Sequence, residues 1–184
     1  MGISDSSYPG FQQFNSSIQN KTLIVDRDNT LIADQVHQID INKLLFLPGV
    51  LENLRKISSM SVNIVIATNQ GGVALGKFSE KNLRVFHDEI NRILITNDIL
   101  LFGVIYCLHH ENAIEDKDKN CECRKPKPGM LKRVIELTNC SQDRTAMIGD
   151  SWRDKHAAAA IKIPYFDANS PEGWVSATEW AEKK

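Results

Sequence analysis

The sequence lacks any long hydrophobic run and any excess of charge of one sign. No apolar stretch approaches the roughly 20 residues that a membrane-spanning helix needs, and the N-terminus lacks the basic-then-apolar order of a signal peptide. Lys and Arg number 22 against 23 Asp and Glu, for a formal net charge of -1. These absences argue against a membrane protein and against a nonspecific binder of nucleic acid or anionic membranes. We therefore expect a cytoplasmic protein.

Internal repeats and linker-like segments are also missing, which favours a single domain. With 184 residues, 42% of them hydrophobic, the chain can bury a core without disulfides. Residues 1–20 are rich in Ser, Gln, Asn and Gly and follow neither the helical nor the strand period, so we expect a flexible polar tail there. Residues 21–184 would form the domain. No apolar heptad or edge-strand signal indicates self-association, so we expect a monomer.

From Lys21 onward, short runs of β-branched and apolar residues alternate with longer amphipathic segments. This alternation predicts βαβ units, and the continuous apolar character of the strands suits a parallel sheet covered on both faces. The expected fold class is α/β, a Rossmann-like parallel sheet flanked by helices. Strands are expected at residues 22–26, 62–68, 103–107, 145–149 and 163–166, and helices at 49–59, 79–96 (with Ser79 as N-cap), 128–137 and 151–161.

Two pairs of aspartates follow two of these buried strands. Asp26 and Asp28 follow the first, and Asp150 and Asp154 follow the fourth, four residues apart and hence on one helix face. Each pair alone is also compatible with solvated acids in an Asx turn. In parallel α/β sheets, however, ligands bind at the carboxyl edge of the strands. Carboxylates that meet there repel one another unless a cation is present, and oxygen ligands favour Mg²⁺.

Two further segments carry groups that bind phosphate. Thr68 and the Gly-containing stretch after it follow the second strand, where a hydroxyl and backbone amides can hold phosphate oxygens. Arg124 and Lys125 precede a predicted helix and place cations near its N-terminus. Taken singly, Thr68 could be a strand cap and Lys125 a solvated charge. Their occurrence together with both aspartate pairs favours a phosphate site.

Three of the four cysteines lie near histidines in one part of the chain. Cys107 with His109, and Cys121 with Cys123, place ligands two residues apart, on one face of an extended segment. Four such ligands fit a structural, tetrahedral Zn²⁺. The alternative is three reduced cysteines near a loop, with His110 beside them. Cys140 is expected to be a free thiol, and the other histidines are expected on the surface or on helix faces: His37, His87 and His156.

The segment between these ligand pairs, residues 111–120, is very polar, so apolar burial could not hold it. We therefore expect zinc to order this loop rather than to make the fold. The loop ends directly at Arg124 and Lys125, so zinc would also position these two cations.

The ordered motifs of the chain resemble those of the haloacid dehalogenase superfamily of phosphatases over residues 21–166. They are Asp26-Arg27-Asp28-Asn29-Thr30, Thr68-Asn69-Gln70, Lys125 and Gly149-Asp150-x-x-x-Asp154. More narrowly, the segments Gly76-Lys77-Phe78, Cys-x-His-His and Cys-x-Cys-Arg-Lys-Pro-x-Pro-Gly-Met are similar to those of the D-glycero-D-manno-heptose-1,7-bisphosphate 7-phosphatases. The histidinol-phosphate phosphatases have the same zinc pattern. The resemblance implies a compact fold with no separate cap domain.

The resemblance also implies roles for individual residues. Asp26 would attack phosphorus and form an aspartyl phosphate, and Asp28 would serve as general acid and then general base. The carboxylates of Asp26 and Asp150, with the backbone carbonyl of Asp28, would hold Mg²⁺, and Asp154 would orient this site from outside the coordination sphere. Thr68 and Lys125 would neutralise phosphoryl charge. The residues expected to contact substrate are Asn69, Gln70, Lys77 and Arg124.

Three positions depart from the family pattern. Asn29 replaces a usual Gly, and Asn tolerates the left-handed backbone that the turn requires. Leu75 replaces an Arg beside the sugar phosphate in the heptose enzymes, and Ser151 replaces a frequent Lys. The two lost cations weaken the assignment of a particular substrate more than the assignment of the reaction.

The resulting hypothesis is a Mg²⁺-dependent phosphomonoester hydrolase that acts on a small-molecule phosphate ester, heptose bisphosphate first and histidinol phosphate second. One alternative is a nucleic acid 3'-phosphatase, against which the zinc ligands and the absence of a basic groove count. Another is a noncatalytic phosphate-binding protein on the same fold, which the presence of both Asp26 and Asp28 disfavours. We expect neither nucleic acid nor a membrane as partner.

Overall fold

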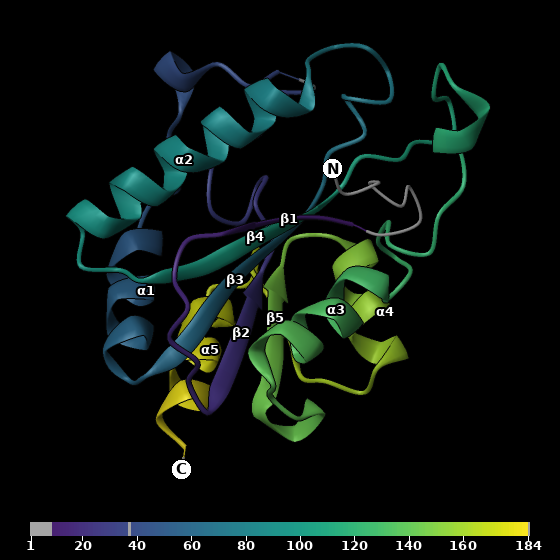
Figure 1. Cartoon of the computed structure of the whole chain (residues 1–184). Helices are drawn as coiled ribbons and strands as arrows, with labels where there is room; N and C mark the ends of the chain where they lie inside the picture. The colour runs from purple at the N-terminus through teal and green to yellow at the C-terminus, as the bar shows by residue number, and fades with distance from the viewer. Residues whose placement is uncertain (1–8, 37, 184) are drawn as a thin grey trace.

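Six strands form one sheet in the order β1-β4-β3-β2-β5-β6 in the computed structural model, which describes residues 9–36 and 38–183. The strands β2 to β6 pair in parallel, and β1 joins the edge strand β4 in antiparallel orientation (Figure 1). The expected α/β class with a parallel sheet is confirmed. The strands are β1 (Gly10–Gln13), β2 (Lys21–Val25), β3 (Val62–Asn69), β4 (Leu101–Cys107), β5 (Thr145–Gly149) and β6 (Tyr165–Asp167).

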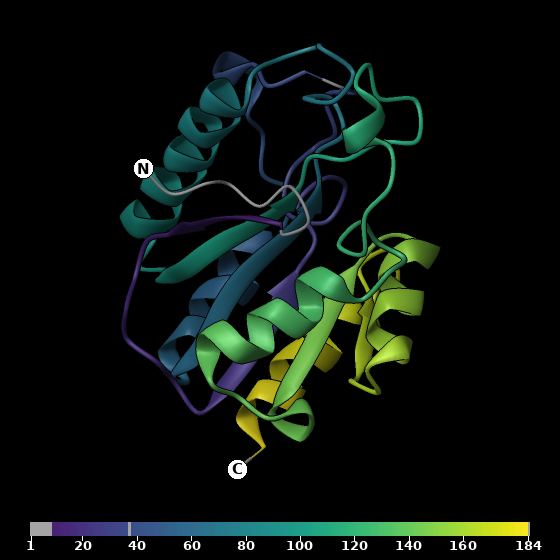
Figure 2. The ribbon, with the colours of Figure 1, turned by 45° about the vertical axis from the view of Figure 1, so that its right-hand side comes forward.

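Helices cover both faces of this sheet (Figure 2). On one face lie α1 (Val50–Ser59), α2 (Glu80–Thr96) and α5 (Gly173–Glu182), and on the other lie α3 (Gly129–Thr138) and α4 (Trp152–Ala160). Short 3₁₀ turns occur at Ile41–Lys43, Asp116–Asp118 and Gln142–Arg144. No helix in the described part of the chain is both long and apolar enough to cross a membrane.

The strand residues divide between the two faces in alternation, as a pleated sheet requires. In β2, Leu23 and Val25 face the α1, α2 and α5 layer, whereas Ile24 faces the α3 and α4 layer. All three are fully buried. This double burial explains why the strands read as continuous apolar runs in the sequence.

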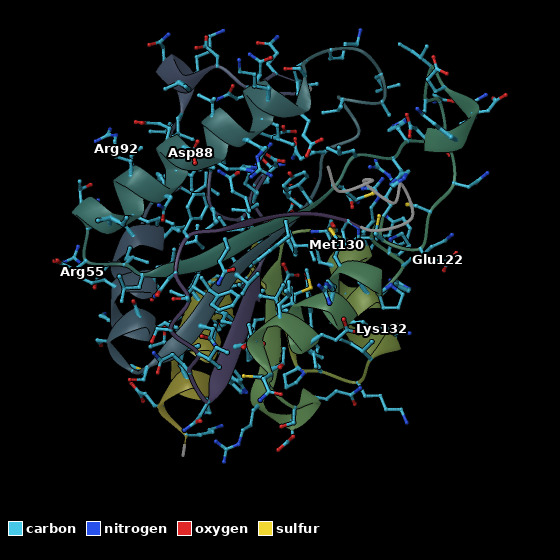
Figure 3. The ribbon with its side chains drawn as sticks, in the orientation of Figure 1. Arg55, Asp88, Arg92, Glu122, Met130 and Lys132 are labelled. Carbon is cyan, nitrogen blue, oxygen red and sulfur yellow. The ribbon has the colours of Figure 1, made fainter. Side chains whose placement is uncertain are left out.

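The two helical layers and their surface side chains lie on opposite sides of the sheet (Figure 3). Arg55, on α1, and Arg92, on α2, lie on one side, and Lys132, on α3, lies on the other. Met130 is fully buried in the second of the two apolar cores. The sheet therefore separates two cores, and its carboxyl edge is left for polar residues.

Residues 10–13 correct one expectation from the sequence. They do not belong to a flexible tail but form β1, in which the side-chain amide of the buried Gln12 donates to a carboxylate oxygen of Asp88 on α2 at 2.5 Å. A polar side chain turned inward hides the strand from hydrophobic periodicity. Residues 1–8 and residue 37 lie outside the described part of the chain, so the expectations for them stay predictions.

Two local expectations are confirmed. Ser79 caps α2, its hydroxyl oxygen accepting from the backbone N–H of Asn82 at 3.1 Å. Asn29 adopts the left-handed region with φ of 57°. The turn after β2 is therefore formed without glycine, directly after Asp28.

Candidate active site

Asp26 and Asp150 follow the neighbouring parallel strands β2 and β5 and lie at the same edge of the sheet. The backbone N–H of Asp26 donates to the carbonyl of Ile148 at 3.0 Å, which continues the pairing of these strands up to the carboxylates. One carboxylate oxygen from each of Asp26, Asp150 and Asp154 lies within 4.8 Å of the others. The topology thus brings together three acids that are far apart in sequence.

Asp154 is fixed by the start of α4. Its Oδ2 accepts from the backbone N–H of Ser151 at 3.1 Å and from the Ser151 hydroxyl at 2.6 Å, as half of a capping box. A Cβ atom at Gly149 would lie 2.6 Å from the Asp154 carboxyl carbon. Glycine is therefore required at residue 149, because any side chain there would displace the fully buried Asp154.

Lys125 lies between two of these acids and contacts both. Its Nζ lies 2.5 Å from Oδ1 of Asp26 and 2.6 Å from Oδ1 of Asp154, and it donates to the Ala67 carbonyl at 2.7 Å. Although burial alone lowers the pKa of Lys125, the two carboxylates raise it above the ordinary value. Lys125 is therefore a fixed cation, with only 3% of its surface exposed.

Asn69, at the end of β3, holds the backbone of Lys125. The Asn69 amide donates to the Lys125 carbonyl and accepts from the Lys125 N–H, both at 3.0 Å. We expected Asn69 to contact substrate directly, and it does line the cleft. Its paired hydrogen bonds show in addition that it joins β3 to the segment that carries the buried cation.

Asp28 lies beside Asp26 with its carboxylate held by two neighbours. Arg27 donates to both of its oxygens at 3.0 Å, and Gln70 donates to Oδ2 at 2.9 Å. Gln70 also donates to the Thr68 hydroxyl oxygen at 2.8 Å, so the hydroxyl proton of Thr68 stays available for another acceptor. Thr68 and Gln70 are both buried at the end of β3.

The group formed by Asp26, Asp150, Asp154 and Lys125 has more acidic than basic side chains. Burial, followed by the charge of Asp154, raises the pKa of Asp150, and burial raises the pKa of Asp26 to about 7 even though Lys125 acts in the opposite direction. Asp26, Asp150 and Asp154 together exceed the single charge of Lys125. Oxygen ligands with excess negative charge match the preference of Mg²⁺, so these residues fit that ion.

A cleft of about 390 Å³ opens over these groups, within the usual range for small-molecule sites. Arg124, expected to contact substrate, lines the cleft, as does His110. Lys77 does not: it lies in a neighbouring groove that shares Phe78 with the cleft. The residues that line the cleft include Asp26, Asp28, Thr68, Asn69, Gln70, Lys125 and Asp150.

The second candidate metal site lies where β4 ends and the following loop returns. Nδ1 of His109 is 3.5 Å from Sγ of both Cys107 and Cys123, and Sγ of Cys107 is 3.6 Å from Sγ of Cys121. A tetrahedral Zn²⁺ with bonds of about 2.3 Å to sulfur and 2.0 Å to nitrogen separates its ligands by roughly 3.5–3.8 Å. These three separations match those of a zinc site, and all four ligand atoms lie within 4.8 Å of one another.

Without a metal, the cluster favours a thiolate at Cys107 only. A hydrogen bond from Cys123 lowers the pKa of the Cys107 thiol to about 6, and the same bond raises the pKa of Cys123. Thiolates are the form of cysteine that binds metals. The cluster is also joined to the cleft, because the Arg124 N–H donates to Sγ of Cys121 at 3.3 Å and its guanidinium donates to the His109 carbonyl at 3.0 Å.

Some residues at the site were not assigned from the sequence. Arg27 stands inside the first aspartate motif, yet only the structure shows its buried contact with Asp28. His87, expected on the surface or on a helix face, is completely buried, and Arg27 donates toward it at 3.4 Å. Arg153, in the first turn of α4, also lines the cleft. The one sequence signal for a role of Arg27 at the site is its position between Asp26 and Asp28.

Comparisons with known proteins agree with this arrangement. The chain matches the family described as polynucleotide kinase 3 phosphatase over residues 21–164. It is 34% identical to the D-glycero-beta-D-manno-heptose-1,7-bisphosphate 7-phosphatase of Haemophilus influenzae over 144 residues, 78% of each chain. It is 32% identical to the enzyme of the same name from Escherichia coli K12, over 77% of this chain and 74% of the relative.

Two solved structures are similar as well. The D,D-heptose 1.7-bisphosphate phosphatase from B. bronchiseptica, complexed with magnesium and phosphate, superposes with a TM-score of 0.74 at 26% identity, over 86% of this chain and 96% of that one. A protein described as a HAD-like phosphatase from Mesorhizobium loti has a TM-score of 0.85 at 18% identity, over 99% and 98%, and supports the fold alone. The chain thus belongs to the polynucleotide kinase 3 phosphatase family and is a phosphatase of the haloacid dehalogenase type.

Proposed function

We propose that this phosphatase hydrolyses a small sugar phosphate, with heptose 1,7-bisphosphate as the first candidate. The observation that carries the reaction is the meeting of Asp26, Asp150, Asp154 and Lys125 at one sheet edge, with Asp28 two residues from Asp26. The substrate class is supported by the heptose bisphosphate phosphatases at 32–34% identity. The volume of the cleft, about 390 Å³, lies within the usual range for small-molecule sites.

In the first step, a carboxylate oxygen of Asp26 attacks phosphorus and the bond between phosphorus and the sugar oxygen breaks. The bond's electron pair passes to the sugar oxygen, which takes a proton from Asp28. In the second step, Asp28 removes a proton from water, and that water attacks phosphorus. The bond to Asp26 breaks, so that inorganic phosphate leaves and the Asp26 carboxylate is restored.

The remaining residues stabilise the transferred group. Lys125 and the Thr68 hydroxyl are the donors for phosphoryl oxygens, which carry most of the charge in phosphoryl transfer. Asp26, Asp150 and the backbone carbonyl of Asp28 would hold Mg²⁺. When bound, this ion supplies positive charge to the phosphoryl oxygens and offsets the excess of carboxylates.

For the second metal, we propose that Cys107, His109, Cys121 and Cys123 bind a structural Zn²⁺. Its function would be to hold the loop of residues 108–125 against the cleft. The contacts from Arg124 to Cys121 and to His109 support this proposal, because they connect the cluster to a residue that lines the cleft.

A phosphate-release screen with Mg²⁺ tests the substrate. It compares both anomers of heptose 1,7-bisphosphate, histidinol phosphate, nucleotides and a 3'-phosphorylated oligonucleotide. We expect the highest kcat/KM for a sugar bisphosphate. A higher value for the oligonucleotide, falling steeply with salt, would instead favour a nucleic acid 3'-phosphatase, the activity named in the family description. No release from any phosphomonoester would contradict the proposed hydrolysis. Sedimentation and fractionation would test the expected monomer and the expected cytoplasmic location.

A further inference from the structure

Arg27 lies between the two aspartates of the first motif with only 3% of its surface exposed. Its Nε donates to Oδ1 of Asp28 and its Nη2 donates to Oδ2, both at 3.0 Å. Two nitrogens of the guanidinium thus bind the two oxygens of the carboxylate. Such a two-point contact fixes direction as well as charge. A buried arginine joined in this way to its sequence neighbour restricts where the Asp28 carboxylate can point.

The far side of Arg27 is held by helix α2. Nη1 lies 3.4 Å from Nε2 of His87, and the guanidinium carbon lies 5.2 Å from the centre of the Phe86 ring. Burial, followed by the charges of Arg27 and Arg84, lowers the pKa of His87 well below its ordinary value, so its ring is neutral and can accept a hydrogen bond. The His87 ring packs in turn against Tyr106 of β4, at 5.4 Å between centres.

Asp28 has a further partner on the strand side. Gln70, at the end of β3, donates to Oδ2 of Asp28 at 2.9 Å. The carboxylate is thus held by donors from two elements, one supported by α2 and the other by the sheet. Rotation of the carboxylate would break bonds to both, while its remaining exposed surface, 24% of the side chain, is what a ligand in the cleft could reach.

We propose that Arg27 is a positioning residue that aims the carboxylate of Asp28 at the reacting oxygen, and that His87 and Phe86 of α2 fix Arg27 for this purpose. The inference rests on the acid-base function proposed for Asp28. It gives α2, which otherwise covers the sheet, a part in the reaction. The competing explanation is that Arg27 only neutralises a nearby charge and fills space in the fold.

A double-mutant cycle separates these explanations. Arg27→Met keeps the length of the side chain and removes its donors. We expect it to lower kcat on the sugar phosphate by about 10- to 100-fold, part of the usual contribution of a general acid or base, with KM changed less than about threefold. In the Asp28→Asn background the same substitution should leave kcat almost unchanged, because the effects of two residues that act through one another do not add.

The leaving group supplies an independent readout. Expulsion of 2,4-dinitrophenolate needs no proton, so single-turnover release from dinitrophenyl phosphate should fall less than about threefold in Arg27→Met, while release from the sugar phosphate falls by the full factor. Arg92→Met is the matched control: Arg92 is also on α2 but donates to Glu89 at the surface, so hydrolysis of both substrates should stay close to that of wild type. Arg27→Lys keeps the charge but not the two-point contact of the guanidinium. Its kcat on the sugar phosphate should lie between those of Arg27→Met and wild type.

Three results would overturn the inference. Equal losses for both substrates in Arg27→Met and Arg27→Lys would show a structural role only. An additive loss in the Asp28→Asn background would show that Arg27 does not act through Asp28, while the proposed function would stand. Wild-type turnover by Asp28→Asn alone would remove the acid-base assignment and this inference with it. If Arg27→Met does not fold, the same cycle is measured with Arg27→Lys.

Discussion

The Nζ atom of Lys125 lies 2.5 Å from a carboxylate oxygen of Asp26, although the two residues are 99 positions apart. The same nitrogen contacts Asp154, so one buried cation joins the first, third and fourth segments of the phosphatase pattern. The site is therefore a single electrostatic unit. Changing any of its charges should alter stability as well as catalysis, and the expectations below follow from this coupling.

Asp26→Asn should abolish turnover while the fold is kept, because an amide oxygen is a poor nucleophile and yet can still accept from Lys125. Asp28→Asn should lower kcat by about 10² to 10⁴, the usual range for acid-base catalysis. Steady-state phosphate release with circular dichroism of both variants checks this. Near-native turnover by Asp26→Asn on any phosphomonoester would contradict the assignment of the nucleophile.

Asp26 should make the protein without Mg²⁺ less stable as pH rises toward neutrality. Burial raises the pKa of Asp26 from 3.8 to about 7, so between these values its carboxyl group binds more protons in the folded than in the unfolded state. The Cys107 thiol, whose pKa is lowered to about 6, acts in the opposite direction but is common to wild type and Asp26→Asn. Between about pH 5.5 and about pH 7.5 the melting temperature of wild type should therefore change less favourably than that of Asp26→Asn, by roughly 4–8 °C. An equal change of melting temperature in both proteins would contradict this expectation.

Lys125→Met should destabilise the fold as well as stop the reaction. It leaves the buried carboxylates of Asp26 and Asp154 without their cation, and removal of one partner of a buried ion pair costs about 3–5 kcal/mol. Urea unfolding without Mg²⁺ measures this loss. The exposed Lys56, paired with Glu52 on α1, provides the control, since Lys56→Met should change stability by less than about 1 kcal/mol.

Asn69→Ala should weaken substrate binding through Lys125. The substitution removes both 3.0 Å hydrogen bonds to the Lys125 backbone, so the cation is less well oriented, and KM should rise about tenfold. Asn53→Ala, which removes only an exposed bond to Gly49 on α1, should leave kinetics unchanged. Equal KM values for the two variants would show that the Asn69 contacts do not matter for binding.

Removal of the zinc proposed for the cysteine cluster should affect kinetics before stability. The sheet already supplies two apolar cores. Chelation of the metal, or Cys121→Ser, should therefore raise KM under conditions in which the melting temperature is still unchanged. Cys140→Ser is the matched control, because Cys140 contacts Thr22 rather than the cluster. Metal analysis should find about one zinc per chain in the control and none in Cys121→Ser. Zinc retained in full by Cys121→Ser would contradict the ligand set.

The parts of the fold predicted from the sequence are those in which burial follows a regular period. The buried strand residues before Asp26 and Asp150 read as apolar runs, which located the sheet edge and the acids on it. The Ser79 cap was predicted because its chemistry is local.

What could not be predicted depends on contacts between distant residues. Strand β1 was not predicted because its Gln12 is buried through a hydrogen bond to Asp88. Helix α5 was not predicted because its buried residues, Gly173, Ala177 and Ala181, are small and form no strong apolar stripe. His87 lies on a helix face, one of the two places expected for it, but its complete burial was not predicted, because residues that pack against it, Arg27 and Tyr106, come from other elements.

Peptide mapping of a quenched reaction tests the assignment of the nucleophile most directly. The Asp28→Asn variant, in which water attack is slow, is mixed with Mg²⁺ and dinitrophenyl phosphate, whose leaving group needs no proton from Asp28, then quenched in acid and analysed by mass spectrometry. We expect one phosphoryl group per chain, bound to Asp26 and lost when the quenched protein is treated with hydroxylamine. A phosphoryl group on any other residue, or none on the protein during turnover, would contradict the account.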